Sequence, residues 1–143
     1  MAVTIRGSGQ VPVQIVQATY AVETSTSSTS YVSTGLSASI TPTNSLNRIL
    51  VLANGIFYNN SSNRGIRVGL IRSGTTIYNP PVYSIYTGFT NIVAPQTITF
   101  LDNPATTSAI TYTFSFATPE GAAVFAQYNN APSILTLMEV AYA

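Results

Sequence analysis

Alternation of polar and apolar residues along short segments is the feature that most constrains the fold of this 143-residue chain. The plainest example is residues 110–117, where threonine or serine alternates with Ile110, Tyr112, Phe114 and Phe116. A side-chain period of two is that of a β-strand with one buried face. No stretch shows an apolar stripe with the period of a helix. The pattern therefore predicts an all-β protein.

Turn-forming residues separate the alternating segments at short intervals. Gly, Pro, Asn, Asp and Ser fill these separators, and each of them favours the backbone geometries of tight turns. Many short strands joined by turns are typical of an antiparallel β-sandwich or a jelly roll. The expected strands cover residues 11–24, 31–33, 36–41, 49–58, 66–72, 75–78, 92–101, 110–117, 122–128 and 134–141.

Two of these strands carry an expected irregularity. Segment 49–58 is apolar on both faces, as expected of a central sandwich strand, but it contains an Asn-Gly pair ending at Gly55. The pair is compatible with a hairpin turn. A bulge at Gly55 fits better, because residues 59–65 already form a fuller turn signal. Strand 92–101 is expected to be interrupted at Pro95, which has no backbone N–H to donate.

The length of the chain fits one domain, which we place at residues 11–143. Residues 1–10 are expected to be a short N-terminal arm, in which Val3 and Ile5 belong to a miniature strand before a glycine-rich tether. Such a strand can add to the sheet edge of another subunit, although frayed termini are the usual alternative. We find neither signal-peptide features nor an apolar run near the ~20 residues that span a bilayer, so no membrane partner is expected.

Ionisable side chains are scarce. Only 6% of the residues are charged, against about 25% in an average soluble protein. A freely diffusing monomer usually carries more charge than this. We therefore expect permanent contact with other subunits. The net charge of +1 gives no cluster of cations for phosphates, so no nucleic-acid partner is expected.

The residue types that most catalytic mechanisms need are missing. The sequence has no His, no Cys and no Lys, which removes the usual general base, thiol nucleophile, Schiff-base amine and zinc ligands. Its carboxylates are Glu23, Asp102, Glu120 and Glu139. Asp102 and Glu120 lie in predicted turns, where ordinary turn roles fit better than a pair of glycosidase acids. We expect no enzyme activity and no metal or other cofactor.

Aromatic side chains gather around one expected loop, residues 79–91. Tyr78, Tyr83, Tyr86 and Phe89 lie there among Asn, Pro and Gly. Tyrosines in exposed loops give rigid contact area with a polar tip, which suits a partner protein or the face of a sugar. The alternative is that these rings cap the sandwich and pack locally.

The remaining candidates are charged residues. Arg64, Arg67 and Arg72 lie close together in the sequence and suit pairing with acidic groups of a neighbouring subunit, or else form a solvated outer face. Glu139 lies in a strand that is apolar on both faces, where a carboxylate needs an arginine or several N–H donors. An intersubunit ion pair and a strand-end position that reaches water fit it about equally.

Four segments together resemble a pattern in virion proteins of marine and freshwater phages, especially cyanophages. They are residues 31–42 (YVSTGLSASITP), 48–52 (RILVL), 101–108 (LDNPATTS) and 134–139 (ILTLME). The similarity extends over about residues 11–143. It implies a jelly-roll-like β-sandwich that trimerises. In that family the domain occurs at the C-terminal ends of tail fibres and as small free-standing proteins.

Because this chain has only the short arm in place of a long fibrous N-terminal region, we expect the homotrimeric cement (decoration) protein, on the outer surface of the capsid. Its partners would be its own copies and the major capsid protein, held by interface burial. The interface candidates are Val3, Ile5, Arg64, Arg67, Arg72 and Glu139. The alternative is the receptor-binding tip of a tail fibre or spike, which would bind host glycan through residues 78–89.

Overall fold

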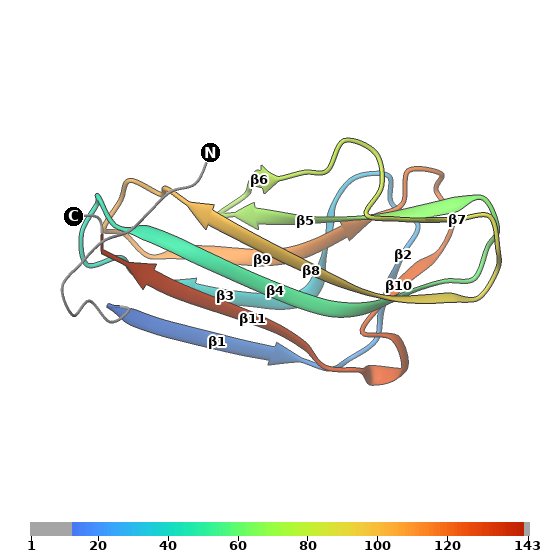
Figure 1. Cartoon of the computed structure of the whole chain (residues 1–143), viewed down its shortest axis with the longest axis horizontal. Coiled ribbons are helices and arrows are strands. Elements are labelled where there is room, and N and C mark those ends of the chain that lie inside the picture. Colours follow the sequence, from blue (N-terminus) through green and yellow to red (C-terminus); the bar gives the residue numbers. More distant parts are fainter. Residues whose placement is uncertain (1–12, 142–143) are drawn as a thin grey trace.

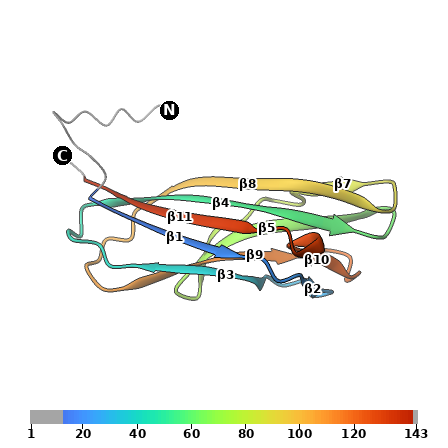
Figure 2. The same ribbon diagram turned by 90° about the horizontal axis from the view of Figure 1, so that it is seen from below.

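The computed structural model describes residues 13–141. The predicted arm, with Val3 and Ile5, lies outside the described residues, so its docking and the boundary at residue 11 stay predictions. The described chain folds into two antiparallel β-sheets that pack face to face (Figures 1 and 2). None of the helices in this part of the chain is long and apolar enough to cross a membrane.

The first sheet has the strand order β1-β11-β4-β8, with two short strands at one end of β4. Its long strands are β1 (Gln14–Tyr20), β11 (Ser133–Val140), β4 (Arg48–Asn59) and β8 (Ile92–Asp102). The short strands are β10 (Val124–Ala126), which pairs with the end of β4, and β2 (Thr24–Thr26), which pairs with β10.

The second sheet has the order β3-β9-β5-β6, and β7 pairs with the start of β5. Its strands are β3 (Val32–Ile40), β9 (Ile110–Ala117), β5 (Arg64–Arg72), β6 (Thr75–Tyr78) and β7 (Ile85–Thr87). A single 3₁₀ turn, η1 (Tyr128–Asn130), follows β10 in the described chain.

The long strands alternate between the two sheets along most of the chain. From β1 the chain passes to β3, returns to β4, crosses to β5 and β6, and then reaches β8, β9 and β11 in turn. Two antiparallel sheets whose eight main strands are connected in this way form a jelly roll. The predicted all-β, jelly-roll-like sandwich is confirmed.

The core lies between the sheets and is built by the inward half of each alternating strand. Phe57 of the first sheet meets Phe114 of the second edge-on, with ring centroids 5.6 Å apart. Fully burying one such side chain stabilises a fold by roughly 1.5–3 kcal/mol. The other large buried apolar side chains include Leu36, Ile40, Ile49, Val51, Ile66, Leu70, Tyr112, Phe116, Leu135 and Leu137.

Neither predicted irregularity of the first sheet is present. β4 pairs with β8 without a register shift from Ile49 to Asn59, so the bulge predicted at Gly55 is wrong. A glycine stands there because a Cβ would lie 2.5 Å from Oγ of Ser133. Pro95 does not interrupt β8 either, because β8 pairs only with β4 among the described strands and an edge strand tolerates proline.

Several predicted boundaries also differ. The strand predicted at 11–24 ends at Tyr20, and its last predicted residue, Thr24, begins the separate short strand β2. The strands predicted on either side of Gly35 form one strand, β3, whose pairing with β9 is irregular there. The backbone of Gly35 has φ +92, and the ring of Tyr20 covers it. β7 lies within the loop predicted at 79–91, and the strand predicted at 122–128 is reduced to β10.

Candidate interaction surfaces

The carboxylate of Glu139, at the end of β11, is fully buried and receives hydrogen bonds only from its own chain among the described contacts. Thr43 donates its backbone N–H and its hydroxyl, both at 2.8 Å. The amides of Asn47 and Gln14 each donate at 2.6 Å. Burial alone raises the pKa of Glu139, but the hydrogen bonds from Asn47, Gln14 and Thr43 outweigh it and hold the pKa below its ordinary value of 4.5.

These contacts satisfy the predicted need for several donors, and they contradict the predicted strand-end position that reaches water. The side chain does not reach water, because its exposed fraction is 0%. It ties the ends of β1 and β11 to the loop between β3 and β4. We therefore assign this residue a stabilising role inside the subunit, and an ion pair with another subunit stays an untested prediction.

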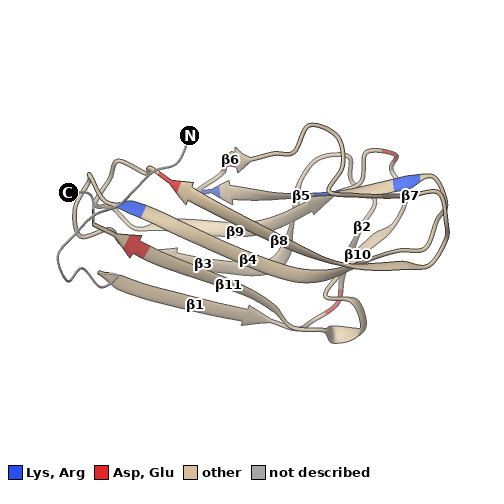
Figure 3. Cartoon of the chain, viewed as in Figure 1, with Lys and Arg blue, Asp and Glu red and all other residues tan. Residues whose placement is uncertain are grey.

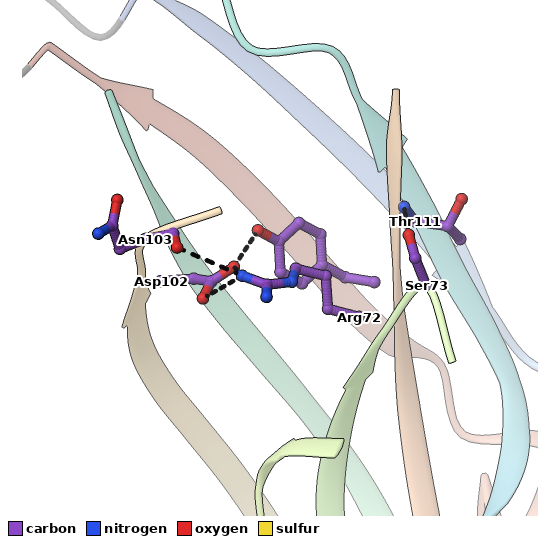
Figure 4. A network of polar contacts seen from close by, with 6 residues as sticks. Arg72, Ser73, Asp102, Asn103 and Thr111 are labelled. Atoms are coloured by element: carbon purple, nitrogen blue, oxygen red, sulfur yellow. Dashed lines mark hydrogen bonds and ion pairs between the residues drawn. The ribbon is translucent and has the colours of Figure 1, made fainter. Parts of the chain in front are cut away.

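A second buried carboxylate joins the two sheets. Asp102 ends β8 of the first sheet and forms an ion pair of 2.8 Å with Arg72, at the end of β5 in the second sheet (Figure 4). The hydroxyl of Tyr112 also donates to Asp102, at 2.6 Å. Burial and this hydrogen bond raise the pKa of the Tyr112 hydroxyl far above its ordinary value of 10.0. Asp102 is thus the end of a strand, not the turn residue predicted, and Arg72 has an acidic partner within its own chain.

The other two candidate arginines also contact their own chain. Arg67 donates to the carbonyl of Thr29 at 2.8 Å, and its guanidinium lies 5.4 Å from the ring centre of Tyr31. Arg64 donates to the carbonyl of Glu120 at 3.5 Å. Both side chains remain partly exposed. Their predicted contact with a neighbouring subunit is untested.

The four aromatic candidates do not form one site. Tyr83 donates a short hydrogen bond to Glu120, and its ring lies 4.9 Å from that of Tyr86. Tyr78 instead packs edge-on against Phe100, 6.1 Å away. Tyr78 and Tyr83 thus follow the predicted alternative of local packing.

The outermost rings of this loop are different. Tyr86 is 55% exposed and Phe89 is 77% exposed, which is the largest value among the exposed apolar side chains of the described chain. These two rings remain available for a partner.

Each of the four Asp and Glu side chains has a polar contact within its own chain. Glu120 accepts from Tyr83 and from the backbone N–H of Gly65, and Glu23 accepts from the backbone N–H of Asn129. Asp102 and Glu139 are buried as described above. In the described chain no group of three or more acidic residues is placed to hold a metal ion. These contacts assign each of the four carboxylates a role in holding its own chain together.

The outer face of the second sheet carries short hydroxyl side chains. Ser33, Ser37 and Ser39 point outward from β3, beside Thr111 and Thr113 of the neighbouring strand β9. The hydroxyls of Ser39 and Thr111 lie 2.7 Å apart. We call this outer surface of β3 and β9 the hydroxyl face. Its groups bond well with water, as expected for a sheet with one solvated side.

The outer face of the first sheet is mostly apolar instead, although Gln17, Thr19, Asn54, Thr97, Thr99 and Thr136 also point outward from it. The burial of β11 and β4 alternates, so the residues between the buried ones point outward. Directly opposite residues on neighbouring strands share a face, and one row across the sheet reads Ile15, Met138, Leu50 and Leu101. We call this surface the apolar face. Its apolar members are Ile15, Leu50, Leu52, Ile56, Tyr58, Val93, Pro95, Leu101, Ile134, Met138 and Val140.

Charged residues in the described chain avoid the middle of this face. Figure 3 shows those of the first sheet's long strands only near strand ends, with the broad middle of β1, β11, β4 and β8 uncharged. Asp102 and Glu139 point inward, so Arg48 is the charged residue at the rim of the apolar face. At the other end, Tyr58 stacks on Tyr128 with centroids 4.2 Å apart.

Sequence reasoning did not identify the apolar face, although its signal was present. Residues 49–58 and the strand of Glu139 were recognised as apolar on both faces. Segment 49–58 was interpreted as a central strand of the sandwich, and the strand of Glu139 was considered only for the partners of its carboxylate. In the structure only one face of each strand meets the core, and the second lies on the outside.

Comparisons with known proteins give a fold and no family. No family model and no curated protein matches the chain. Among solved structures, the VP2 subviral particle of infectious bursal disease virus matches 99% of this chain and 43% of its own, with a TM-score of 0.52 and 14% identity. The whole particle of that virus matches 96% of this chain and 39% of its own, with a TM-score of 0.48 and 13% identity.

The chain thus spans less than half the length of the viral proteins it resembles. At such low identity the first similarity supports a shared β-sandwich fold and says nothing more specific about this chain.

Proposed function

We propose that this protein is a structural component of a virus particle, and that it acts as a homotrimeric cement protein on the outer surface of the capsid. The observation that carries the proposal is the apolar face, a broad surface with no charged residue in its middle (Figure 3). All four Asp and Glu side chains of the protein accept hydrogen bonds from their own chain. Such a surface suits a subunit that works by burying area against neighbours.

Two further observations support a particle setting. The fold resembles that of a viral particle protein, the VP2 of infectious bursal disease virus. The sequence resembles virion proteins of cyanophage type over about residues 11–143. A jelly roll hosts many functions, so these similarities raise the expectation without assigning the role.

The mechanism of a cement protein is mechanical. Each subunit would bury surface against its two mates and against the major capsid protein, and so oppose the outward pressure of packaged nucleic acid. Several interfaces of standard size that act together give strong attachment through avidity. No bound cofactor is needed for this work.

Quantitative mass spectrometry of purified particles tests this proposal. A cement protein is expected at hundreds of copies per particle, and particles that lack it should release nucleic acid at a lower temperature. Absence of the protein from purified particles would refute the structural role. A normal heat stability of particles without it would refute the cement role.

The second candidate is the receptor-binding tip of a tail fibre or spike. The exposed rings of Tyr86 and Phe89 favour it, because aromatic faces stack on sugars. A tip protein is expected at a handful of copies per particle. It should also bind a host glycan on an array, and Phe89→Ser should lose that binding. An array without signal, at a high copy number, would leave only the cement role.

A further inference from the structure

We infer that copies of this chain associate with one another through the apolar face of the first sheet. The inference deepens the proposed function, of which self-association is a part, and it replaces the arginine-bearing strand β5 as the main contact between copies. The candidate arginines of β5 have intrachain contacts, whereas the apolar face, apart from Tyr58 at one end, is exposed or only partly buried in the described chain.

The sequence of β4 gives the first argument. A strand in an antiparallel sandwich normally alternates between an apolar inner face and a polar outer one. β4 buries Ile49, Val51 and Phe57 inward, yet it places Leu50, Leu52 and Ile56 on the outside. A strand that is apolar on both faces is suited to burial on both faces. Residues 13–141 bury only one of them, which leaves the other for a second molecule.

The size of the face gives the second argument. β4 is 12 residues long. Its neighbours β1, β11 and β8 have 7, 8 and 11 residues. At about 3.3 Å per residue along a strand and about 4.8 Å between strands, the four strands together present ~600 Å² before side-chain relief is added. A standard interface buries about 800 Å² on each partner. The face is therefore of the size that a stable contact between two proteins needs.

The chemistry of the face identifies the occupant as a second copy. An uncharged surface cannot select a different partner through opposite charges, which is how many heterologous interfaces obtain their specificity. Contacts between identical subunits are the more apolar class, and Met and Tyr are enriched in them. Met138 lies within the face and Tyr58 at one end of it. When such a face turns toward a three-fold axis, it can meet both neighbours of a trimer.

The opposite side of the molecule supplies a built-in comparison. The hydroxyl face belongs to the same chain and is equally poor in charge, yet it exposes Ser37, Ser39 and Thr111. The apolar character of the first sheet therefore does not simply follow from the low charge of the chain. The two faces are adapted to different surroundings, one to protein and one to water.

Cysteine labelling can test this directly, because the chain has no cysteine of its own. Asn54→Cys places a thiol on β4, at the middle of the apolar face. Ser37→Cys places a thiol on the hydroxyl face. Both native side chains are exposed in the isolated chain. With a maleimide reagent and the native assembly, we expect the first thiol to react at least tenfold more slowly than the second. After denaturation both should react at the same rate.

A second experiment disrupts the contact. Leu52→Glu introduces a charge into the apolar face, and Ser37→Glu is the matched control on the hydroxyl face. By light scattering coupled to size exclusion, the first variant should be a monomer and the second should keep the mass of the wild type. Circular dichroism shows whether each variant is folded, and if Leu52→Glu does not fold, the labelling result decides alone.

The outcomes separate this inference from the proposed function. Equal labelling rates in the native assembly, or a wild type that stays monomeric at all concentrations, would overturn the inference even if the protein is abundant in particles. Slow labelling at position 54 in a protein that is absent from particles would support the inference and overturn the proposed function.

Discussion

Replacing Glu139 by glutamine keeps the volume of a fully buried side chain and removes its negative charge. Three donors converge on Oε1, namely the backbone N–H and hydroxyl of Thr43 and the amide of Asn47. The amide of Gln14 donates to Oε2. In the variant an NH₂ group takes the place of one of these oxygens, and the remaining hydrogen bonds lose their charged acceptor.

The expected loss of stability follows from that count of donors. A hydrogen bond to a charged group contributes about 1.5–3 kcal/mol and a neutral one about 0.5–1.5 kcal/mol, so each bond weakens by roughly 1 kcal/mol. If Gln14 turns its own amide to suit the new NH₂ group, the three bonds at Oε1 still weaken. We therefore expect Glu139→Gln to lower the free energy of unfolding by about 3 kcal/mol at neutral pH. For a chain of this length the melting temperature should fall by roughly 10 °C.

The pH dependence gives a sharper test. The hydrogen bonds hold the pKa of Glu139 in the folded protein below its ordinary value of 4.5. A carboxyl with a lowered folded pKa contributes stability that is complete above pH 4.5 and is lost as the pH falls through the folded pKa. The difference in the free energy of unfolding between wild type and Glu139→Gln should therefore be largest at neutral pH and shrink below pH 4.5.

Thermal denaturation at pH 7 and at pH 3, at one fixed protein concentration, measures both effects. The control is Glu23→Gln, since Glu23 is exposed and accepts one hydrogen bond from the backbone of Asn129. The control should change the free energy of unfolding by less than about 1 kcal/mol. If wild type and Glu139→Gln differ in stability as much at pH 3 as at pH 7, or do not differ at pH 7, the charge of this carboxylate does not stabilise the fold.

Two further substitutions test the packing of the sheets. Gly55→Ala should lower the free energy of unfolding by about 1–3 kcal/mol, because its Cβ would meet Oγ of Ser133 at 2.5 Å. Gly88→Ala is the control and should be near neutral, because its Cβ would make only an ordinary contact with Oδ1 of Asn63 at 3.7 Å; equal melting temperatures would refute the close approach. Tyr112→Phe removes the hydrogen bond to Asp102 and should cost about 1.5–3 kcal/mol in urea unfolding. Because the pKa of Tyr112 is raised in the fold, this cost should shrink above pH 10.0, and a cost that persists there would contradict the role of the hydroxyl.

The fold was predictable because the alternation of side chains is a local property. Residues 110–117 alternate in sequence and form β9 as predicted, with Tyr112 and Phe114 buried. The bulge at Gly55 was predicted wrongly, because a glycine in a strand marks either a bulge or the close approach of another group. Only the position of Ser133, which is 78 residues away in sequence, decides between the two.

The roles of the charged residues were less predictable, because their partners are distant in sequence. Arg72 and Asp102 are 30 residues apart, and Glu139 and Thr43 are 96 residues apart. The chain length between such residues says nothing about their separation in space. The need of Glu139 for several donors was predictable from its apolar neighbours, but the identity of the donors was not.

The structure changes the interpretation of the low charge of this chain. The sequence suggested that the few charged residues, such as Arg72 and Glu139, would join one subunit to another. The structure uses both to hold its own sandwich together. The two sheets therefore present two neutral outer faces. Water solvates the hydroxyl face well, and it solvates the mainly aliphatic and aromatic side chains of the apolar face poorly. A protein of this kind gains most free energy by covering the second face, and a charge placed there would have to be desolvated in every assembled copy. The same charge on the hydroxyl face would stay in water, so the position of a charge on this molecule, more than its presence, should decide whether copies can assemble.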